Sequence, residues 1–517
     1  MGNAAEIGAG RICDRGKGIM NIKQAKNEIK HTVQAYLAKD GQGEYKIPAV
    51  RQRPVLLMGP PGIGKTQIME QIARELGIGL VAYTITHHTR QSAVGLPFIR
   101  EEEFEGKTYS VTEYTMSEII ASVYRRIRDS GQREGILFID EINCVSETLA
   151  PTMLQFLQCK TFGNQAVPEG WLIVAAGNPP EYNKSVRDFD MVTLDRVRYL
   201  TVEADLKVWK EYARAQHIHG AILSYLELRP DNFYRVEADV DGVRFVTARG
   251  WEDLSALMGV YEELGLAVDE TVVMEFLHHE QIAEDAAAYF DLYRKYEDDY
   301  GIPEILAGKV KPAVFARIFK AAFDERIAVT NLLCDGLRGL FQKTAEARDL
   351  ADGWYAFLKE YRSAVAEDAQ PVELYGRLLA EREQAFLSAA ENGSYTREQK
   401  SRGKQLLRLL KENSPQGDGA KECFMSAAAG FERQKEALAA LETQTAQAVE
   451  YAFDFMEQAF EKGQEMVVFV TELTMGSESA LFLSEHTCER YRQYSEQLLT
   501  GTRRAELLSE LARDGEL

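Results

Sequence analysis

The sequence contains few cysteines and no long apolar run. Its six cysteines lie far apart among 517 residues and form no CxxC pair, so we expect reduced thiols rather than a disulfide framework. No uninterrupted apolar stretch approaches the roughly 18 residues that a membrane-spanning helix needs. The first residues also lack the apolar core of a secretory signal. These absences predict a cytoplasmic protein that has no membrane as its partner.

The chain also has fewer positive than negative side chains. The chain has 60 Lys and Arg residues against 80 Asp and Glu residues, which gives a formal net charge of −20. A chain of this charge repels the phosphate backbone of a nucleic acid at long range, which argues against a role in coating nucleic acid. The hydrophobic fraction of 45% is that of a globular protein. The length predicts about three domains.

The expected elements change in kind along the chain. Residues 1–19 are rich in Gly, Ala and charge, which indicates a disordered leader. In residues 20–202, strand-like runs at 55–58, 80–85, 136–139 and 172–176 alternate with helical segments. This alternation is typical of a mostly parallel sheet that is wrapped by helices. A stretch near 98–116 alternates around Gly106 and predicts an inserted hairpin.

The rest of the chain is mainly helical. Residues 203–325 predict a helical domain with one small hairpin that turns at Asp241-Gly242. Residues 326–517 predict a helical C-terminal domain, because only Pro371 and Pro415 interrupt the helical pattern there. Within this domain, residues 424–460 predict a helix of roughly 55 Å. Such a helix indicates either a projecting helical hairpin arm at 420–463 or a long helix inside a plain bundle.

One motif predicts a phosphate-binding loop. The sequence Gly59-Pro60-Pro61-Gly62-Ile63-Gly64-Lys65-Thr66 fits G-x-x-x-x-G-K-[ST], and it lies between a strand-like run and a helical segment that continues with Gln67. The glycines let successive backbone N–H groups point at an anion, and the start of the helix adds its positive end. We expect Lys65 to reach the β- and γ-phosphates of a nucleotide and the Thr66 hydroxyl to take one position on Mg²⁺.

Polar side chains follow two other strand-like runs. Asp140 and Glu141 end the run 136–139, and an unpaired buried carboxylate is costly, so the pair must face water or something positive. Asp140 is placed to hold Mg²⁺ through water, and Glu141 to polarise a water for in-line attack on the γ-phosphate. The run 172–176 delivers Asn178 to the same edge, where its amide would orient this water. A turn-forming Asn is the alternative interpretation.

These residues resemble the motifs of a known family. The loop 59–66, the sequence 140–143 and Asn178 are similar to the Walker A, Walker B and sensor 1 motifs of MoxR-type AAA+ ATPases. The expected hairpin resembles the helix 2 insert of that clade. The resemblance implies an α/β P-loop NTPase core with a mostly parallel sheet, an α-helical lid and a long α-helical C-terminal region. It also implies Mg²⁺-dependent ATP hydrolysis at the subunit boundaries of a homo-oligomeric ring, usually a hexamer. Members remodel a client protein like chaperones, often with a von Willebrand A domain protein.

Two arginines resemble functional residues of the same family. Arg196 lies in a triplet, residues 195–197, that is similar to the family's D-R-F, which implies an arginine finger that reaches into a neighbour's ATP site. Arg187 and Arg198 compete for this role. Arg249 resembles the sensor 2 arginine at the start of a lid helix, although the proline that usually precedes it is absent.

Two other functions remain open from the sequence. The chain could be a nucleotide-gated scaffold, in which slow hydrolysis only times the display of the C-terminal helices to a partner. It could also be a DNA-acting AAA+ motor, but the acidic charge and the lack of a recognisable nucleic-acid module argue against this. The remodelling ATPase is the leading hypothesis because both the glycine loop and the acidic pair are intact.

Overall fold

The computed structural model describes residues 19–498, apart from 88–89, 163–164, 183–188, 239–241, 366–369, 392–394, 418 and 462. The expected leader at 1–19 therefore lies almost wholly outside the described residues. The chain forms two compact units. One comprises Met1–Trp209 and Phe233–Trp251, and we call it the α/β unit. The other comprises Lys210–Asn232 and Glu252–Leu517, and we call it the helical unit.

A six-stranded parallel sheet forms the centre of the α/β unit, in the order β1-β10-β2-β9-β6-β3. Its strands are β1 (Ile19–Asn21), β2 (Val55–Met58), β3 (Gly79–Thr84), β6 (Gly135–Asp140), β9 (Trp171–Gly177) and β10 (Arg198–Glu203). The three central strands are apolar almost throughout because both faces of the sheet are covered. The predicted fold class, a mostly parallel α/β core followed by long helical regions, is confirmed.

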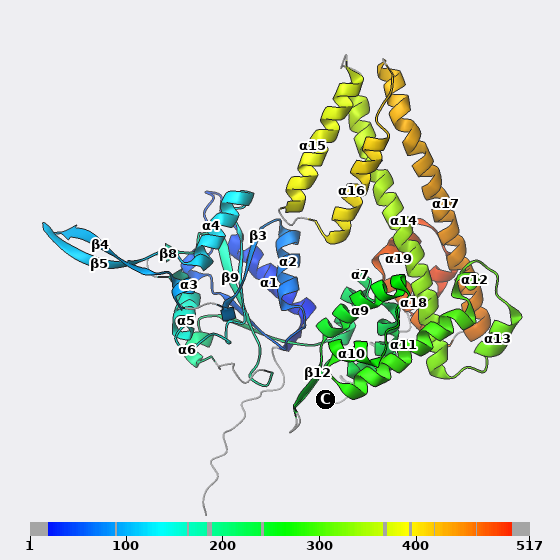
Figure 1. Cartoon of the computed structure of the whole chain (residues 1–517), viewed down its shortest axis with the longest axis horizontal. Coiled ribbons are helices and arrows are strands. Elements are labelled where there is room, and N and C mark those ends of the chain that lie inside the picture. Colours follow the sequence, from blue (N-terminus) through cyan, green and yellow to red (C-terminus); the bar gives the residue numbers. More distant parts are fainter. Residues whose placement is uncertain are drawn as a thin grey trace, which may run out of the picture. The chain divides into compact units, whose positions relative to one another are not determined.

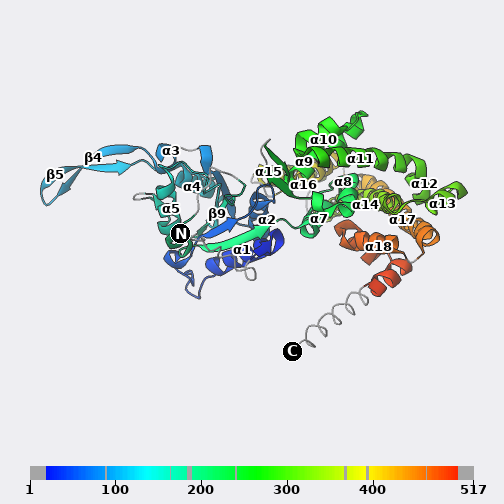
Figure 2. The same ribbon diagram turned by 90° about the horizontal axis from the view of Figure 1, so that it is seen from below.

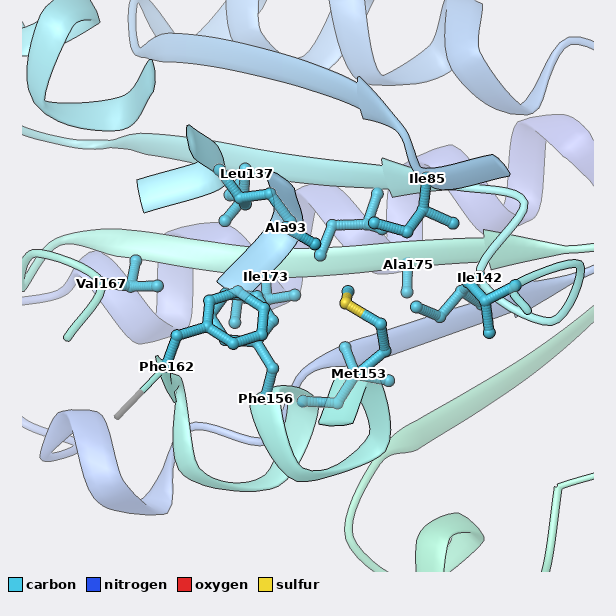
Figure 3. Packing of buried hydrophobic residues seen from close by; sticks show 14 of the residues in the cluster. Ile85, Ala93, Leu137, Ile142, Met153, Phe156, Phe162, Val167, Ile173 and Ala175 are labelled. Carbon is cyan, nitrogen blue, oxygen red and sulfur yellow. The ribbon is translucent and has the colours of Figure 1, made fainter. Parts of the chain in front are cut away.

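Helices cover both faces of this sheet, because successive side chains of a strand point to opposite faces. Phe138 of β6 packs in a cluster with α1 (Ile22–Leu37) and α2 (Lys65–Leu76), whereas its neighbour Leu137 packs in a cluster with α4 (Glu118–Ser130) and α5 (Ala150–Cys159). Figure 3 shows the second cluster, in which Met153 and Phe156 of α5 lie against β9. The helices of this unit are α1 (Ile22–Leu37), α2 (Lys65–Leu76), α3 (Arg90–Val94), α4 (Glu118–Ser130), α5 (Ala150–Cys159) and α6 (Met191–Leu194).

Three antiparallel ribbons belong to the described part of the α/β unit. The longest pairs β4 (Pro97–Phe104) with β5 (Lys107–Tyr114) and extends away from the sheet in Figures 1 and 2. It occupies the place of the insert expected near 98–116. The others pair β7 (Thr161–Phe162) with β8 (Gln165–Ala166), and β11 (Arg235–Ala238) with β12 (Val243–Val246). The β11–β12 ribbon is the expected small hairpin, but Asp241 of its turn lies outside the described residues.

The helical unit contains the remaining helices, of which α7 and α9 begin in the α/β unit. They are α7 (Leu206–Ala215), α8 (Gly220–Leu228), α9 (Ala248–Leu264), α10 (Glu270–Leu277), α11 (Glu280–Tyr300), α12 (Ile302–Leu306), α13 (Pro312–Ile318), α14 (Phe323–Val365), α15 (Pro371–Glu391), α16 (Arg397–Glu412), α17 (Ala420–Phe460), α18 (Gln464–Met475) and α19 (Ser477–Glu485). The boundary expected at 325/326 falls inside the continuous helix α14, and the helices on both sides of it belong to one compact unit. The expected domain division stays a prediction.

Two long helices dominate the helical unit. Helix α14 has 43 residues, helix α17 has 41, and the two pack along each other. Thr344 and Thr445 share a buried hydrogen bond of 2.9 Å across this contact. Residues 420–460 thus form one continuous helix that packs along α14.

The far ends of these two helices carry a separate core. Trp354 and Phe357 of α14 pack with Tyr375 of α15, Leu410 of α16 and Ala427 of α17. We call α15, α16 and the adjoining parts of α14 and α17 (residues 349–365 and 420–431) the arm, which is visible in Figure 1 beside the shorter helices of its unit. Among the described residues, no single helix is long and apolar enough to cross a membrane, although α18 and α19, bent by 88° at their break, pass this test as a pair.

Candidate functional site

The carboxyl ends of four parallel strands meet at one edge of the sheet. The register aligns Thr84 of β3 with Asp140 of β6, and Met58 of β2 with Gly177 of β9. Strand β9 lies between β2 and β6, so the residues that follow these three strands lie side by side. Side chains that directly follow these ends can therefore act on one ligand.

The glycine loop turns sharply from β2 into α2. Gly62 and Gly64 have φ angles of 74° and 90°, a left-handed conformation that glycine adopts without strain. A Cβ on Gly59 would lie 2.8 Å from the carbonyl oxygen of Val202, so the first glycine is needed for close packing against β10. Ile63 anchors the loop in the core beside α2. The loop thus presents backbone N–H groups at the positive end of a helix, as an anion site requires.

Lys65 is almost fully buried within this loop, at 8% exposure. Its ammonium group donates hydrogen bonds of 2.8 Å to the carbonyl oxygens of Gly59 and Pro60 and to Oδ1 of Asn178. The pKa of Lys65 is lowered to about 8, chiefly by burial; the charge of Asp140 opposes this shift and the charge of Arg249 contributes to it. All three ammonium protons have acceptors, so a phosphate oxygen must replace one of these bonds when it binds.

Thr66 and Asp140 lie together at the start of α2 and the end of β6. The Thr66 hydroxyl donates to Oδ2 of Asp140 at 2.9 Å, and the other carboxylate oxygen accepts the backbone N–H of Glu141 at 2.9 Å. A hydroxyl and a carboxylate side by side are hard oxygen donors of the kind that bind Mg²⁺ beside substrate phosphates. The donor set therefore fits the predicted metal.

Glu141 adopts a left-handed backbone conformation, with a φ angle of 57°. Such a conformation is uncommon for a residue with a Cβ and typical of constrained sites. Its carboxylate accepts a hydrogen bond of 3.0 Å from the hydroxyl of Thr86, which follows β3. Glu141 is therefore held from the neighbouring strand end while Asp140 faces Thr66.

Asn143 holds the backbone of Asn178 through both its N–H and its carbonyl group. The Asn143 amide donates to the carbonyl oxygen of Asn178 at 2.8 Å, and Oδ1 of Asn143 accepts the Asn178 N–H at 3.3 Å. Asn143 is buried, at 3% exposure, and a Cβ on Gly177 would lie 2.5 Å from its Oδ1. The small residue before Asn178 therefore makes room for the amide that fixes the position of Asn178.

The segment Phe233–Trp251 packs against the glycine loop, although it lies far from that loop in sequence. The Tyr234 hydroxyl donates to the carbonyl oxygen of Pro61 at 2.9 Å. A Cβ on Gly62 would lie 3.0 Å from the side chain of Thr247 and 3.5 Å from Cβ of Arg249. Arg249 is the second residue of α9 and is exposed beside the loop.

The arginine candidates lie elsewhere. Arg196 lies two residues before β10, whose first residue pairs with the first residue of β2, so it lies at the sheet edge opposite the glycine loop. It is exposed and donates to Oε1 of Gln158. Arg198 instead donates to the Thr32 hydroxyl at 2.8 Å and pairs with Glu28, both on α1 of the same chain. Arg187 lies outside the described residues.

The structure thus brings the predicted loop, Lys65, Thr66, Asp140, Glu141, Asn178 and Arg249 to one sheet edge and leaves Arg196 at the other. Three contacting residues were not singled out by sequence: Thr86, Tyr234 and Thr247. A signal existed for Thr86, because it is a polar residue that directly follows the strand-like run 80–85. Tyr234 and Thr247 carried no such signal, because they reach the loop only through tertiary packing.

Comparisons with known proteins agree with this geometry. Residues 54–197 match the family described as AAA domain (dynein-related subfamily). A curated relative from Bos taurus, the ATPase family gene 2 protein homolog B, is 34% identical over 94 residues. That match covers 18% of this chain and only 10% of the relative. Together the two matches support an AAA+ ATPase core with a nucleotide site, and the family match contains the strand ends and Arg196 described above.

Proposed function

We propose that this chain, which carries an AAA domain, hydrolyses ATP at the boundaries between copies in a ring and uses the energy to remodel a partner protein, as MoxR-type ATPases do. The observation that carries the proposal is the division of its charged residues between two sheet edges. Lys65, Thr66, Asp140 and Glu141 lie at one edge, and the exposed Arg196 lies at the other.

The chain's own residues can perform each part of the hydrolysis. The backbone N–H groups of the loop and the start of α2 bind the phosphates, and the Lys65 ammonium exchanges a carbonyl for a phosphate oxygen. Thr66 and Asp140 would hold Mg²⁺, which when bound neutralises charge on the phosphates. Glu141 accepts a proton from the attacking water, and Asn178 orients that water through its amide.

Arg196 supports the assembly of several copies. Along β10, the register places it roughly 10 Å or more from the loop end of its own sheet, at 3.3 Å per residue. It can therefore reach a phosphate only in another copy, where its planar cation would neutralise charge on the transferring phosphoryl group. A contact between two different edges is heterologous, and such contacts form a ring when the rotation between copies closes. We therefore propose a ring, with six copies as the resemblance implies.

Two exposed elements suit a protein partner. The β4–β5 ribbon exposes Phe104 and Tyr109 at 52% and 51%, and a large exposed aromatic pair is typical of a contact surface. The helical unit supplies the arm, which carries its own core. A protein with a von Willebrand A domain is the partner that the resemblance favours, and we propose it as the first candidate for binding experiments.

The Glu141→Gln variant tests this function. We expect it to bind ATP like the wild type and to lose steady-state hydrolysis by about 10³-fold, because the base is lost while the phosphate contacts remain. Glu203→Gln is the matched control, since it removes a carboxylate from the end of β10, which β2 and β9 separate from β6 in the same sheet. Unchanged hydrolysis in Glu141→Gln would refute the role of Glu141. Partner proteins that copurify with this ATP-trapped variant would identify the client.

A further inference from the structure

Positive charge gathers on one helix of the arm. Helix α16 contains six Lys and Arg residues and two Glu residues, in a chain whose net charge is −20. Lys400, Lys404, Arg408 and Lys411 recur every three or four residues, so they share one face of the helix. Arg408 pairs with Glu412 and Lys411 with Glu383, whereas Lys400 and Lys404 have no acidic partner among the described residues. This helix is therefore a local attractor for anions on an otherwise acidic protein.

A cavity of about 420 Å³ lies between α16 and the neighbouring helices α14 and α15 of the same unit. Two arginines line it, Arg382 from α15 and Arg402 from α16, together with a single acidic residue, Asp349 from α14. The volume is within the range of ligand sites in proteins, which is roughly 300–1,000 Å³. The cavity thus combines an adequate size with an excess of positive charge.

The two guanidinium groups are anchored one helical turn apart. Arg402 pairs with Asp349 and, more loosely at 4.0 Å, with Glu398 of its own helix, and Arg382 donates to the carbonyl oxygen of Gly353 at 3.4 Å. These two positions on α14 are four residues apart, which corresponds to about 6 Å along the helix axis. Two guanidinium groups at this spacing can both bind one carboxylate, because each presents a planar fork of donors.

Neither arginine is fully satisfied within the described part of the chain. Nε of Arg402 is buried and has no hydrogen-bond partner there. Arg382 has no carboxylate partner among these residues, and its other contact is the Phe357 ring, 6.0 Å from the guanidinium carbon. A buried donor without an acceptor is costly. An incoming anion would satisfy both side chains, whereas a second cation would be repelled.

The other wall of the cavity is apolar. The rings of Phe386 and Tyr395 stack with centroids 5.6 Å apart and an interplanar angle of 24°. Leu406 and Leu407 of α16 line the cavity beside them. A Cβ on Gly403 would lie 2.2 Å from the Phe386 ring, so the glycine allows α15 and α16 to approach. The cavity therefore suits an anionic group joined to an aromatic or branched apolar group.

We propose that this cavity is a docking site for an acidic segment of a partner protein, in which a carboxylate binds Arg382 and Arg402 and a neighbouring apolar side chain packs on Phe386 and Tyr395. The basic face of α16 favours a peptide over a small acid. Its two cations without an acidic partner, Lys400 and Lys404, lie on either side of Arg402 in the sequence of α16 and are about 6 Å apart along the helix, so they add positive charge that one carboxylate in the cavity does not use. A segment with several acidic residues matches the cavity and this face together.

Fluorescence anisotropy with the full chain tests the proposal. The probe is a short fluorescein-labelled peptide of alternating Glu and Phe, and its control has Gln in place of Glu. We expect the Glu peptide to bind and the Gln peptide to bind at least about tenfold more weakly, because hydrogen bonds between charged groups are lost. Arg382→Gln should weaken the Glu peptide by a similar factor. Equal affinity for the two peptides, or no binding of the Glu peptide, would overturn the proposal.

Two further variants separate docking from charge alone and from folding. Arg408→Gln removes the same charge from α16 outside the cavity, where Arg408 pairs only with Glu412 of its own helix. We expect at most a threefold or so weakening, since the residue contributes only to the long-range field. Asp349→Asn should instead tighten binding, because Asp349 competes with the peptide for Arg402. If Arg408→Gln weakens binding as much as Arg382→Gln, or if Asp349→Asn weakens it, the cavity is not the site.

This inference is independent of hydrolysis. Binding is measured without nucleotide, so a chain that failed to hydrolyse ATP could still bind the peptide. Conversely, Arg382→Gln should leave basal ATP hydrolysis unchanged, because Arg382 belongs to the arm and not to the nucleotide site. Loss of peptide binding with full basal hydrolysis is the expected combination, and loss of both would overturn the assignment of Arg382 to docking.

Discussion

The two units of this protein use charged side chains in different ways. In the α/β unit, Asp140 ends a strand, Glu141 follows it and Lys65 begins the helix after the glycine loop, and their partners include backbone carbonyls and hydroxyls at the same sheet edge. In the helical unit, Arg214 and Glu472 are 258 positions apart and join in a two-bond ion pair, with side chains only 9% and 14% exposed. The charged residues of the α/β unit lie where a ligand can bind them, whereas Arg214 and Glu472 bind each other inside the helical unit.

This difference affects how each set responds to substitution. Substituting a charged residue of the ligand site should change the stability of the fold little, but it should abolish the chemistry of the site. A charge in a buried ion pair contributes little to chemistry. Its removal destabilises the fold, because the partner charge is left buried without a counter-charge. The following variants test whether the two units separate in this way.

The largest expected effect is the loss of hydrolysis when Arg196 is substituted. Arg196→Ala should lower hydrolysis by about 10³-fold and leave ATP binding unchanged, because the finger acts on the transition state. Arg198→Gln is the matched control, since Arg198 pairs with Glu28 and Thr32 of its own chain. Mixing Arg196→Ala with Glu141→Gln copies should restore some hydrolysis where an intact base meets an intact finger. If such mixtures never regain activity, the finger is another residue.

The second largest effect is on stability. Arg214→Gln should lower the free energy of unfolding of the helical unit by about 3 kcal/mol, because it leaves Glu472 buried without its main partner. Urea unfolding followed by circular dichroism measures the change. Arg408→Gln, which breaks an exposed pair, should cost less than about 1 kcal/mol. Equal effects of the two variants would contradict the distinction between buried and exposed pairs.

The same pair predicts a pH dependence. Burial alone would raise the pKa of Glu472, but the hydrogen bond and charge of Arg214, with the charge of Arg338, lower it below the ordinary 4.5. A carboxyl group with a lowered pKa stabilises the fold above 4.5, and this contribution is lost as the pH falls through the folded-state pKa. The stabilities of the wild type and Glu472→Gln should therefore converge in acid. A gap that stays constant down to pH 3 or so would contradict this.

A smaller effect is expected at Asn143. Asn143→Ala removes both hydrogen bonds that hold the peptide unit of Asn178. We expect hydrolysis to fall by about tenfold with little change in ATP affinity, because only the orientation of the attacking water is disturbed. Steady-state kinetics with a separate binding measurement distinguishes the two quantities. A large loss of ATP affinity with normal turnover would show that Asn143 supports the loop instead.

The smallest effect is expected at Thr86. Thr86→Val keeps the shape of the side chain but removes the hydrogen bond to Glu141, which is worth about 1 kcal/mol. A carboxylate freed of this bond is a stronger base and freer to turn to water, so basal hydrolysis should rise by about fivefold or less. Single-turnover measurements test this direction. Slower hydrolysis would mean that Thr86 holds Glu141 in its reactive position.

The site was largely predictable because its residues follow strands. Lys65, Asp140 and Asn178 each lie within a short motif at a strand end, and parallel strands bring such ends together. Sequence could not decide between Arg196 and Arg198, because the contact of Arg198 with α1 spans most of the α/β unit. The ion pair of Arg214 and the packing of Tyr234 on the loop also could not be predicted from the sequence, since each joins segments that lie far apart in the chain.

The fold shows the same limit. The alternation of strand-like and helical segments predicted a parallel α/β core, because both periodicities are local. The long helix at 420–460 was expected as well, but its partner was not, since the pairing of α14 with α17 joins residues about a hundred positions apart, as Thr344 and Thr445 do. Helical periodicity marks which face is buried and does not say against which helix.

Isothermal titration calorimetry of the purified chain with ATP and Mg²⁺ tests the central claim most directly. We predict one nucleotide bound per chain in the wild type and in Glu141→Gln, and loss of binding in Lys65→Ala, because Lys65 is the buried cation of the loop. Absence of nucleotide binding by the wild type, or binding to Lys65→Ala with unchanged affinity, would contradict it.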